Sequence, residues 1–443
     1  MKRTILSLLA LAAVSSVAAM GQINCASGAA AQKLVCEFPF ATGVLANDSA
    51  LGVSSSGSSG ALTAQQVAAS INTGIATQVS QLPLASASAG TVVVYRGGVP
   101  ETFNNLGPIL TDRAQTVGRH KLFIGFTASQ FVFTDIDGSS LGTLPFAWAA
   151  PAYVNNTLVT TTYTKENTNL KFKIDQFIGV ATFGISNRID LSAIVPVEYV
   201  SLGATTSGSQ SYVVNSSGAC VFPSYPNCAY TNPSTHTDGT ASGVGDINFN
   251  LKASVWTGEH ATVAAAFNLR TPTGDDRNYL GSGAWGFNPY IVYSYLWKLS
   301  PHAKVGYQWN TSTELNPQYV TDPNTGNLKY NGNLSLPGGV QYDVGADWAA
   351  ARHLTLAGDL LGNQFINTPK LVPTTTPITV SGTLEPLATS VPGNSSYTIN
   401  NLSAGLKLNP IGQLVLSGNV LIQLNNNGLR SRPTPLVGIS YKF

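Results

Sequence analysis

Charged side chains in this chain recur at every second position of short alternating segments, which is the spacing that places side chains on one face of a β-strand. Neither sign dominates, and the whole chain carries a formal net charge of +2. Such a face could line a polar constriction in a solute path, or it could simply be the solvated interior of a barrel. The residues expected on this inner path are Lys171, Lys173, Asp175, Asp190, Glu198, Asp246, Lys252, Arg270, Lys304, Asp343, Asp347 and Asp359.

Catalysis is not expected from these residue types. Outer-membrane lipid hydrolases place a serine and a histidine on an outward, mid-strand face, and no histidine here lies beside such a serine. Four histidines fall at expected strand ends, where solvated rim positions are the simplest interpretation, and one falls in a long loop: His120, His260, His302, His353 and His236. We therefore predict a non-enzyme with no catalytic residue, no cofactor and no metal site, and keep a lipid hydrolase as the weaker alternative.

The elements that would position the charged residues are strands. From Lys121 onward, alternation recovers about twelve segments of roughly 9 to 14 residues, the length that a tilted membrane strand needs. In the last segment Val437, Ile439, Tyr441 and Phe443 share one face, which suits lipid, whereas the alternate residues suit a wet lumen. The prediction is an all-β fold: a transmembrane antiparallel β-barrel of about twelve strands.

The connections between these segments alternate in length, as outer-membrane barrels require. Short turns are expected near 186–188, 258–259, 299–301, 349–351 and 409–412. Long or polar loops are expected at 134–167, 203–243, 272–285, 311–335, 364–396 and 425–434. This alternation favours an even strand number with both chain ends in the periplasm.

The first residues indicate export. Lys2 and Arg3 precede a short apolar run and a small-residue cleavage site, so residues 1–21 are predicted to be a signal peptide. Only 10% of the residues are charged, and no later run is apolar enough for a membrane helix. We expect a location in a Gram-negative outer membrane. No basic patch with interleaved aromatic residues suggests nucleic acid.

Residues 22–119 stand outside the strand repeat, and residues 120–443 form the predicted barrel. A helix is expected from Thr63 to Gln81, because Val67, Ile71, Ile75 and Val79 recur every four residues. The segment could plug the lumen, or it could be a periplasmic or partner-docking extension. Four cysteines in an exported chain indicate disulfides, and sequence proximity favours Cys25 with Cys36 and Cys220 with Cys228 among three connectivities.

Several motifs resemble an outer-membrane family, that of the MetA pathway of phenol degradation, which is akin to long-chain fatty-acid transporter barrels. They include Arg113 to Gly118, Phe133 to Gly138, Gly184 to Leu191, Gly243 to Ile247 and Leu269 to Asp275. The resemblance covers about residues 110–300 and implies a transporter-type barrel, with no binding residues to carry over. The terminal Tyr441 and Phe443 resemble the signal that the barrel-assembly machinery reads.

These features together predict an outer-membrane channel or transporter for small solutes, apolar or aromatic ones among them. Its expected partners are outer-membrane lipid and lipopolysaccharide, the barrel-assembly machinery and the solute. The alternative is a structural or adhesive barrel that displays disulfide-stapled loops.

Overall fold

The protein was studied as a computed structural model, which describes residues 23, 25, 32–41, 64–83, 92–96, 99–103, 105–154, 157–221, 228–321 and 328–443. The predicted signal peptide, residues 1–21, lies outside the described residues. Within the described ranges, no helix is long and apolar enough to cross a membrane.

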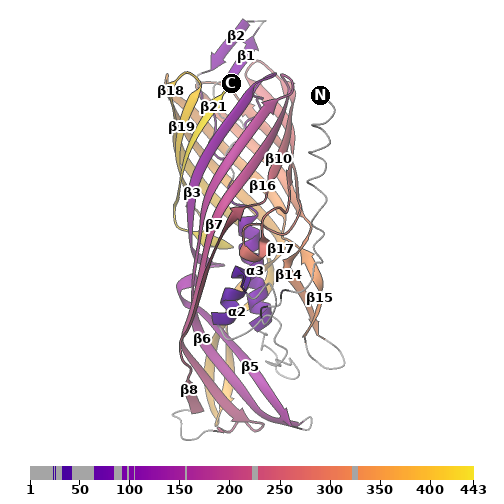
Figure 1. The fold of residues 1–443 in the computed structure, drawn as a ribbon, viewed down its shortest axis with the longest axis vertical. Helices are drawn as coiled ribbons and strands as arrows, with labels where there is room; N and C mark the ends of the chain where they lie inside the picture. Colours follow the sequence, from indigo (N-terminus) through magenta and orange to yellow (C-terminus); the bar gives the residue numbers. More distant parts are fainter. Residues whose placement is uncertain are drawn as a thin grey trace.

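Twelve antiparallel strands close into a barrel (Figure 1). The circle closes because the last strand pairs with the first, with Val437 opposite Ala128 and Tyr441 opposite Ile124. The predicted fold class and strand number are therefore confirmed. The wall strands are β3 (Leu122–Ile136), β6 (Thr157–Gly184), β7 (Ile189–Asn215), β10 (Asn248–Thr257), β11 (Ala261–Arg270), β12 (Gly286–Tyr295), β13 (Leu299–Asn310), β16 (Gly339–Ala351), β17 (Leu354–Val380), β18 (Thr383–Ile411), β19 (Leu414–Gln423) and β21 (Thr434–Lys442).

Alternation along each strand divides the wall into an apolar outer face and a largely polar inner face. On the outer face Phe126 is 59% exposed and Val437 61% exposed, as expected for side chains that face lipid. Trp256, Trp297 and Trp348 are about half exposed near short turns, where aromatic residues suit the membrane interface. This closed wall with its apolar outer belt is that of an outer-membrane protein.

The two ends of the barrel differ. At one, which we call the turn end, five connections of two to four residues fall at 185–188, 258–260, 296–298, 352–353 and 412–413. They match the predicted short turns to within three residues. At the opposite end, the loop end, the connections are long and contain β4 (Ser139–Ser140), η3 (Leu141–Thr143), β5 (Leu144–Val154), β8 (Ala229–Thr231), β9 (Thr235–Val244), η5 (Asp276–Asn278), β14 (Ser312–Thr321), β15 (Leu328–Ser335) and β20 (Leu429–Ser431).

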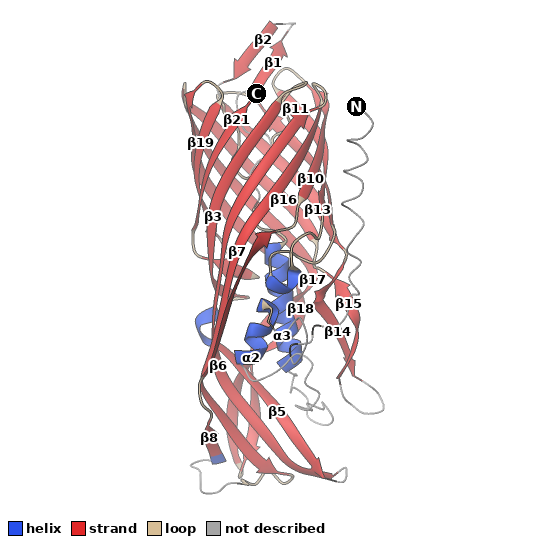
Figure 2. Ribbon diagram, viewed as in Figure 1, coloured by secondary structure: helices blue, strands red, loops and turns tan. Residues whose placement is uncertain are grey.

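The prediction of a loop at 364–396 is wrong. β17 and β18 pair as far as Val380 and Thr383, so this stretch is a ribbon that projects beyond the barrel. It turns at Ser381 and Gly382, which both have positive φ. β6 and β7 form a second ribbon, which replaces part of the loops expected at 134–167 and 203–243 (Figure 2). Thr, Ser and Pro suggested loops, but main-chain pairing along a ribbon does not require apolar side chains.

The two ribbons pack against each other near their tips. Tyr212 and Val214 of β7 share a small apolar cluster with Ile378, Val380 and Leu387 of the other ribbon. Cys220 is disulfide-bonded to Cys228 beside this cluster, and Cys25 is bonded to Cys36, so the favoured connectivity is confirmed.

We expect the double substitution Cys220→Ser and Cys228→Ser to loosen the ribbon tips without unfolding the barrel. Cys220 N donates a hydrogen bond to Ser381 Oγ, and the Ser381 amide donates to the Gly218 carbonyl, so the disulfide loop supports the neighbouring tip. Closing so short a loop contributes about 2–3 kcal/mol locally. Limited proteolysis should cut within 216–232 faster in the variant, at an unchanged barrel unfolding midpoint. Unchanged cleavage would contradict this role.

The N-terminal segment contributes helices and one hairpin. These are η1 (Leu34–Cys36), α2 (Glu37–Ala41), α3 (Ala64–Val79), β1 (Val92–Arg96) and β2 (Val99–Phe103). The predicted helix is therefore present, and its stripe is buried: Ile71 and Ile75 are each 1% exposed. α2 and α3 lie toward the loop end, and the β1–β2 hairpin lies by the C-terminus at the turn end (Figure 1).

Candidate functional site

Most of the predicted inner-path residues do face the lumen. Asp190, Glu198, Asp246, Lys252, Arg270, Asp343, Asp347 and Asp359 are all buried, and Lys304 pairs with Asp343 on the inner wall. The assignment is wrong for Lys171, Lys173 and Asp175. In β6 the buried positions are the even-numbered ones, including Phe172 and Ile174, so the odd-numbered charged residues lie on the outer face. Both faces of this strand are mixed near the loop end, which is why polarity alone misplaced them.

At the turn end, residues 105–117 of the N-terminal segment fill the lumen. The Lys407 ammonium donates to the carbonyl oxygens of Leu106 and Pro108, at 3.3 and 2.6 Å. Lys252 donates to the Arg113 carbonyl at 2.9 Å. These lysines therefore bind the main chain of the segment.

Further inner-wall side chains bind the same segment. The Ala114 amide donates to Ser294 Oγ, and Ser254 Oγ donates to the Ala114 carbonyl. The Val117 amide donates to Asp190 Oδ2 at 2.8 Å. An irregular chain inside a barrel must have its main-chain groups paired, and polar side chains of the wall supply these partners.

His302 lies at the centre of a buried cluster beside this segment. Its Nε2 is 2.8 Å from Asp359 Oδ1 and 2.9 Å from Thr111 Oγ1, and its Nδ1 is 3.5 Å from Asp347 Oδ2. The expectation that this histidine is a solvated rim residue is wrong, because its side chain is only 2% exposed. The strand-end position suggested a rim, but residues 105–117 cover it.

At the loop end, α3 closes the lumen (Figure 1). The apolar face of α3 packs among Phe131, Phe133 and Phe172 of the inner wall and Tyr279 of the 271–285 connection. Tyr279 OH donates to Asn72 Oδ1 at 2.6 Å. The end of the helix is held by Arg270, which donates to the Ser80 carbonyl at 2.8 Å.

The loop beside η5 also holds the N-terminal segment. Lys33 forms an ion pair of 2.8 Å with Asp275, and the Leu34 amide donates to Asn278 Oδ1 at 3.2 Å. The charged form of the neighbouring Asp276 is disfavoured first by burial and then by the Glu314 carboxylate, which together raise its pKa to about 7. The segment thus contacts the loop end as well as the turn end.

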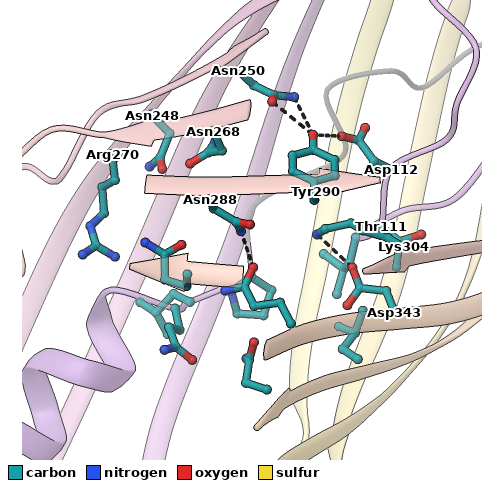
Figure 3. Close-up of a pocket in the computed structure, with 18 of the residues that line it drawn as sticks. Thr111, Asp112, Asn248, Asn250, Asn268, Arg270, Asn288, Tyr290, Lys304 and Asp343 are labelled. Carbon is teal, nitrogen blue, oxygen red and sulfur yellow. Dashed lines mark hydrogen bonds and ion pairs between the residues drawn. The ribbon is translucent and has the colours of Figure 1, made fainter. Parts of the chain in front are cut away.

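Between these two contacts lies a chamber of about 180 Å³. Ser80 to Pro83, after α3, border it on the loop side, and Leu110 to Asp112 border it on the turn side. The side chains that line it from the wall are mostly amides, as Figure 3 shows for the labelled asparagines. The amide residues are Gln81, Asn248, Asn250, Asn268, Asn288, Gln308, Gln341, Asn363 and Asn401.

Each charged residue of the chamber has a countercharge. Lys304 Nζ is 2.9 Å from Asp343 Oδ2, and Arg270 Nε is 3.6 Å from Asp246 Oδ2. Asp112 is 3.7 Å from Lys252 Nζ and also accepts a 2.6 Å hydrogen bond from the Tyr290 hydroxyl. The chamber is therefore polar but electrically balanced.

Sequence reasoning found most of the charged wall residues but not the amide set, and it left insertion of the N-terminal segment as one of two alternatives. Asn248 and Asn250 alternate with Phe249 and Leu251, so the pattern did place them on the inner face. Their convergence with asparagines from other strands depends on strand register, which alternation does not fix. Among the described residues, no group of three or more His, Cys, Asp or Glu side chains is placed to hold a metal ion.

A family model described as "Putative MetA-pathway of phenol degradation" matches residues 154–355. The chain resembles this family. The match covers wall strands β6 to β16 and stops short of the N-terminal segment. No curated protein matches the sequence.

Solved structures that resemble this barrel are outer-membrane proteins. An outer-membrane channel from Pseudomonas putida F1 is 13% identical, with a TM-score of 0.41, over 74% of this chain and 98% of that one. The toluene transporter TbuX of Ralstonia pickettii is 10% identical, with a TM-score of 0.30, over 73% and 89%. A mutant of the monoaromatic hydrocarbon channel TodX is 8% identical, with a TM-score of 0.32, over 74% and 91%.

Proposed function

We propose that this protein is an outer-membrane channel for small solutes, closed by its own N-terminal segment. The observation that carries the proposal is the chamber inside the closed wall, bounded on both sides by residues of that segment. A barrel of about twelve strands is wide enough to hold a solute path and narrow enough for one inserted chain to block it.

Residues 22–119 act as the plug in this proposal. Their hydrogen bonds to the wall are concentrated at 105–117, and their apolar contacts are concentrated on α3. The turn end would face the periplasm, with the C-terminus, because short turns are periplasmic in such barrels. Tyr441 and Phe443 would then be available to the barrel-assembly machinery, and the ribbons would extend among lipopolysaccharide.

The loop half of the path supports passage of apolar or aromatic solutes. Phe131, Phe133 and Phe172 line it, with ring centroids 6.3 and 4.9 Å apart in succession. These rings are covered by α3 in the closed state, so outward movement of the helix would offer an apolar surface to an entering solute. Transport of this kind needs no catalytic residue, and we propose none.

We expect Lys407→Met to open the turn end more often. The substitution leaves the Leu106 and Pro108 carbonyls without their charged donor, and such hydrogen bonds contribute about 1.5–3 kcal/mol. The time-averaged current of the full chain in planar bilayers should therefore rise roughly tenfold or more, given that 1.4 kcal/mol is a factor of ten in an equilibrium.

The matched control is Lys298→Met, which removes a lysine from a turn-end connection between β12 and β13. It should leave the current at the wild-type level. If Lys407→Met folds and adds no current, either alone or when α3 is also loosened by Ile71→Asp and Ile75→Asp, residues 105–117 do not gate the lumen. If neither the wild type nor any loosened variant conducts, the channel itself is refuted.

A further inference from the structure

The chamber differs in chemistry from the apolar half of the path that leads to it. Its wall is made of carboxamides contributed by separate strands, including Asn250 of β10, Asn268 of β11 and Asn288 of β12 (Figure 3). A carboxamide both donates and accepts hydrogen bonds, so it can replace the water around a hydroxyl group in either role. A path that passed only hydrocarbons would not need these groups.

The same wall is an unfavourable environment for ions. Lys304 and Arg270 are already paired with Asp343 and Asp246, and Asp112 is bound by Tyr290 and Lys252. An ion entering the chamber would lose hydration without gaining an unpaired countercharge, which is a costly transfer. Because its charges are already paired, the wall of the chamber therefore disfavours both cations and anions.

One oxygen of the chamber lining has no partner in the closed structure. Asn288 is 6% exposed, and its Oδ1 is buried without a hydrogen-bond partner among the described residues, whereas its Nδ2 donates to Gln341. This oxygen packs against Gly306, 2.7 Å from the position that a Cβ would occupy there. Because a buried acceptor without a partner is unfavourable, a solute hydroxyl that reaches the Asn288 carboxamide would gain a hydrogen bond there.

We propose that the chamber is a selectivity site for uncharged, hydroxyl-bearing solutes, which it prefers over ions of the same size. The proposal rests on the channel function proposed above and deepens it. A volume of about 180 Å³ accommodates on the order of ten water molecules, so a solute of a few carbon atoms and several hydroxyl groups can displace them.

The test is solute flux into proteoliposomes that contain the full chain with Lys407→Met, Ile71→Asp and Ile75→Asp, which loosen the plug at both ends but do not line the chamber. The probes are arabinose, its carboxylate arabinonate, and protonated Tris, a hydroxylated cation. We expect arabinose to enter about tenfold faster than either ion. Arabinonate or Tris entering as fast as arabinose would overturn the inference while leaving the channel intact. Absence of flux for every probe would overturn the channel function itself, and the inference with it.

Variants of the wall separate selection from simple leakage. Asn268→Leu with Asn363→Leu should lower arabinose flux about tenfold, whereas Asn331→Leu, an exposed substitution in the β14–β15 hairpin, should not change it. Asp343→Asn leaves the Lys304 ammonium without its 2.9 Å countercharge, so arabinonate flux should rise relative to arabinose. Selectivity that is unmoved by all of these substitutions would place the filter elsewhere and contradict the proposal.

Discussion

Replacing Ile71 and Ile75 of α3 by aspartate should release the loop-end block of the lumen and raise the conductance of the barrel. Both side chains are 1% exposed within the apolar cluster of the loop half, so two carboxylates there would be buried without partners. Each such burial costs several kcal/mol. A shift of about 5.5 kcal/mol is enough to move a two-state equilibrium from 1:99 to 99:1. We therefore expect the helix to leave the lumen and the mean current in planar bilayers to rise by at least an order of magnitude.

The control for this variant is Ala69→Asp, which adds one carboxylate to the partly exposed flank of the same helix. It should conduct like the wild-type chain. Slower migration of the unheated sample in a gel would show whether each variant has lost its folded barrel. Combining the two substitutions with Lys407→Met also loosens the turn-end contacts. If that chain keeps its folded barrel yet conducts no more than Lys407→Met alone, α3 is not what blocks the loop half.

The largest loss of stability should come from breaking the cluster around His302. His302→Leu would leave the Asp347 and Asp359 carboxylates side by side in a buried place, where loss of one partner of a buried pair typically costs about 3–5 kcal/mol. Asp359→Leu should cost a similar amount. The double variant should lose less than the sum of the two single losses, because it removes both sides of the 2.8 Å contact.

Urea unfolding of the barrel in lipid vesicles, followed by tryptophan fluorescence, gives the four free energies of this cycle. His353→Leu provides the matched comparison, since this histidine is an exposed residue of a turn-end connection. It should change the free energy of unfolding by less than about 0.5 kcal/mol. Strictly additive losses for the two cluster variants would indicate that His302 and Asp359 do not stabilise each other.

The barrel could be predicted because its signal is local. Ile439 and Tyr441 alternate with Ser440 and Lys442, and this alternation alone fixes a strand with two chemically different faces. Lys171 and Lys173 show where this logic fails, because β6 continues beyond the barrel as a ribbon, and near that end neither face has to be apolar. The same reason hid the β17–β18 ribbon, whose threonines and prolines carry no clear alternation.

The candidate site could not be predicted in the same way, because its contacts join residues far apart in the sequence and no local pattern encodes them. Lys407 binds carbonyl groups about 300 positions earlier in the chain, at Leu106 and Pro108. The stretch 105–117 has neither helical nor strand periodicity, since it is held by wall side chains and not by its own secondary structure. Register likewise decides which asparagines meet, and register emerges only when the whole wall is closed.

The closed seam between β21 and β3 limits the directions in which the inserted segment can move. Residues 105–117 run through a ring that has no opening along its side, and the wall strand β3 follows them closely in the sequence. Once the first and last strands have paired, the segment can leave or enter only through an end of the lumen. Its C-terminal side stays tethered to β3 at the turn end. Any opening that keeps the barrel folded therefore has to move the segment along the axis of the lumen.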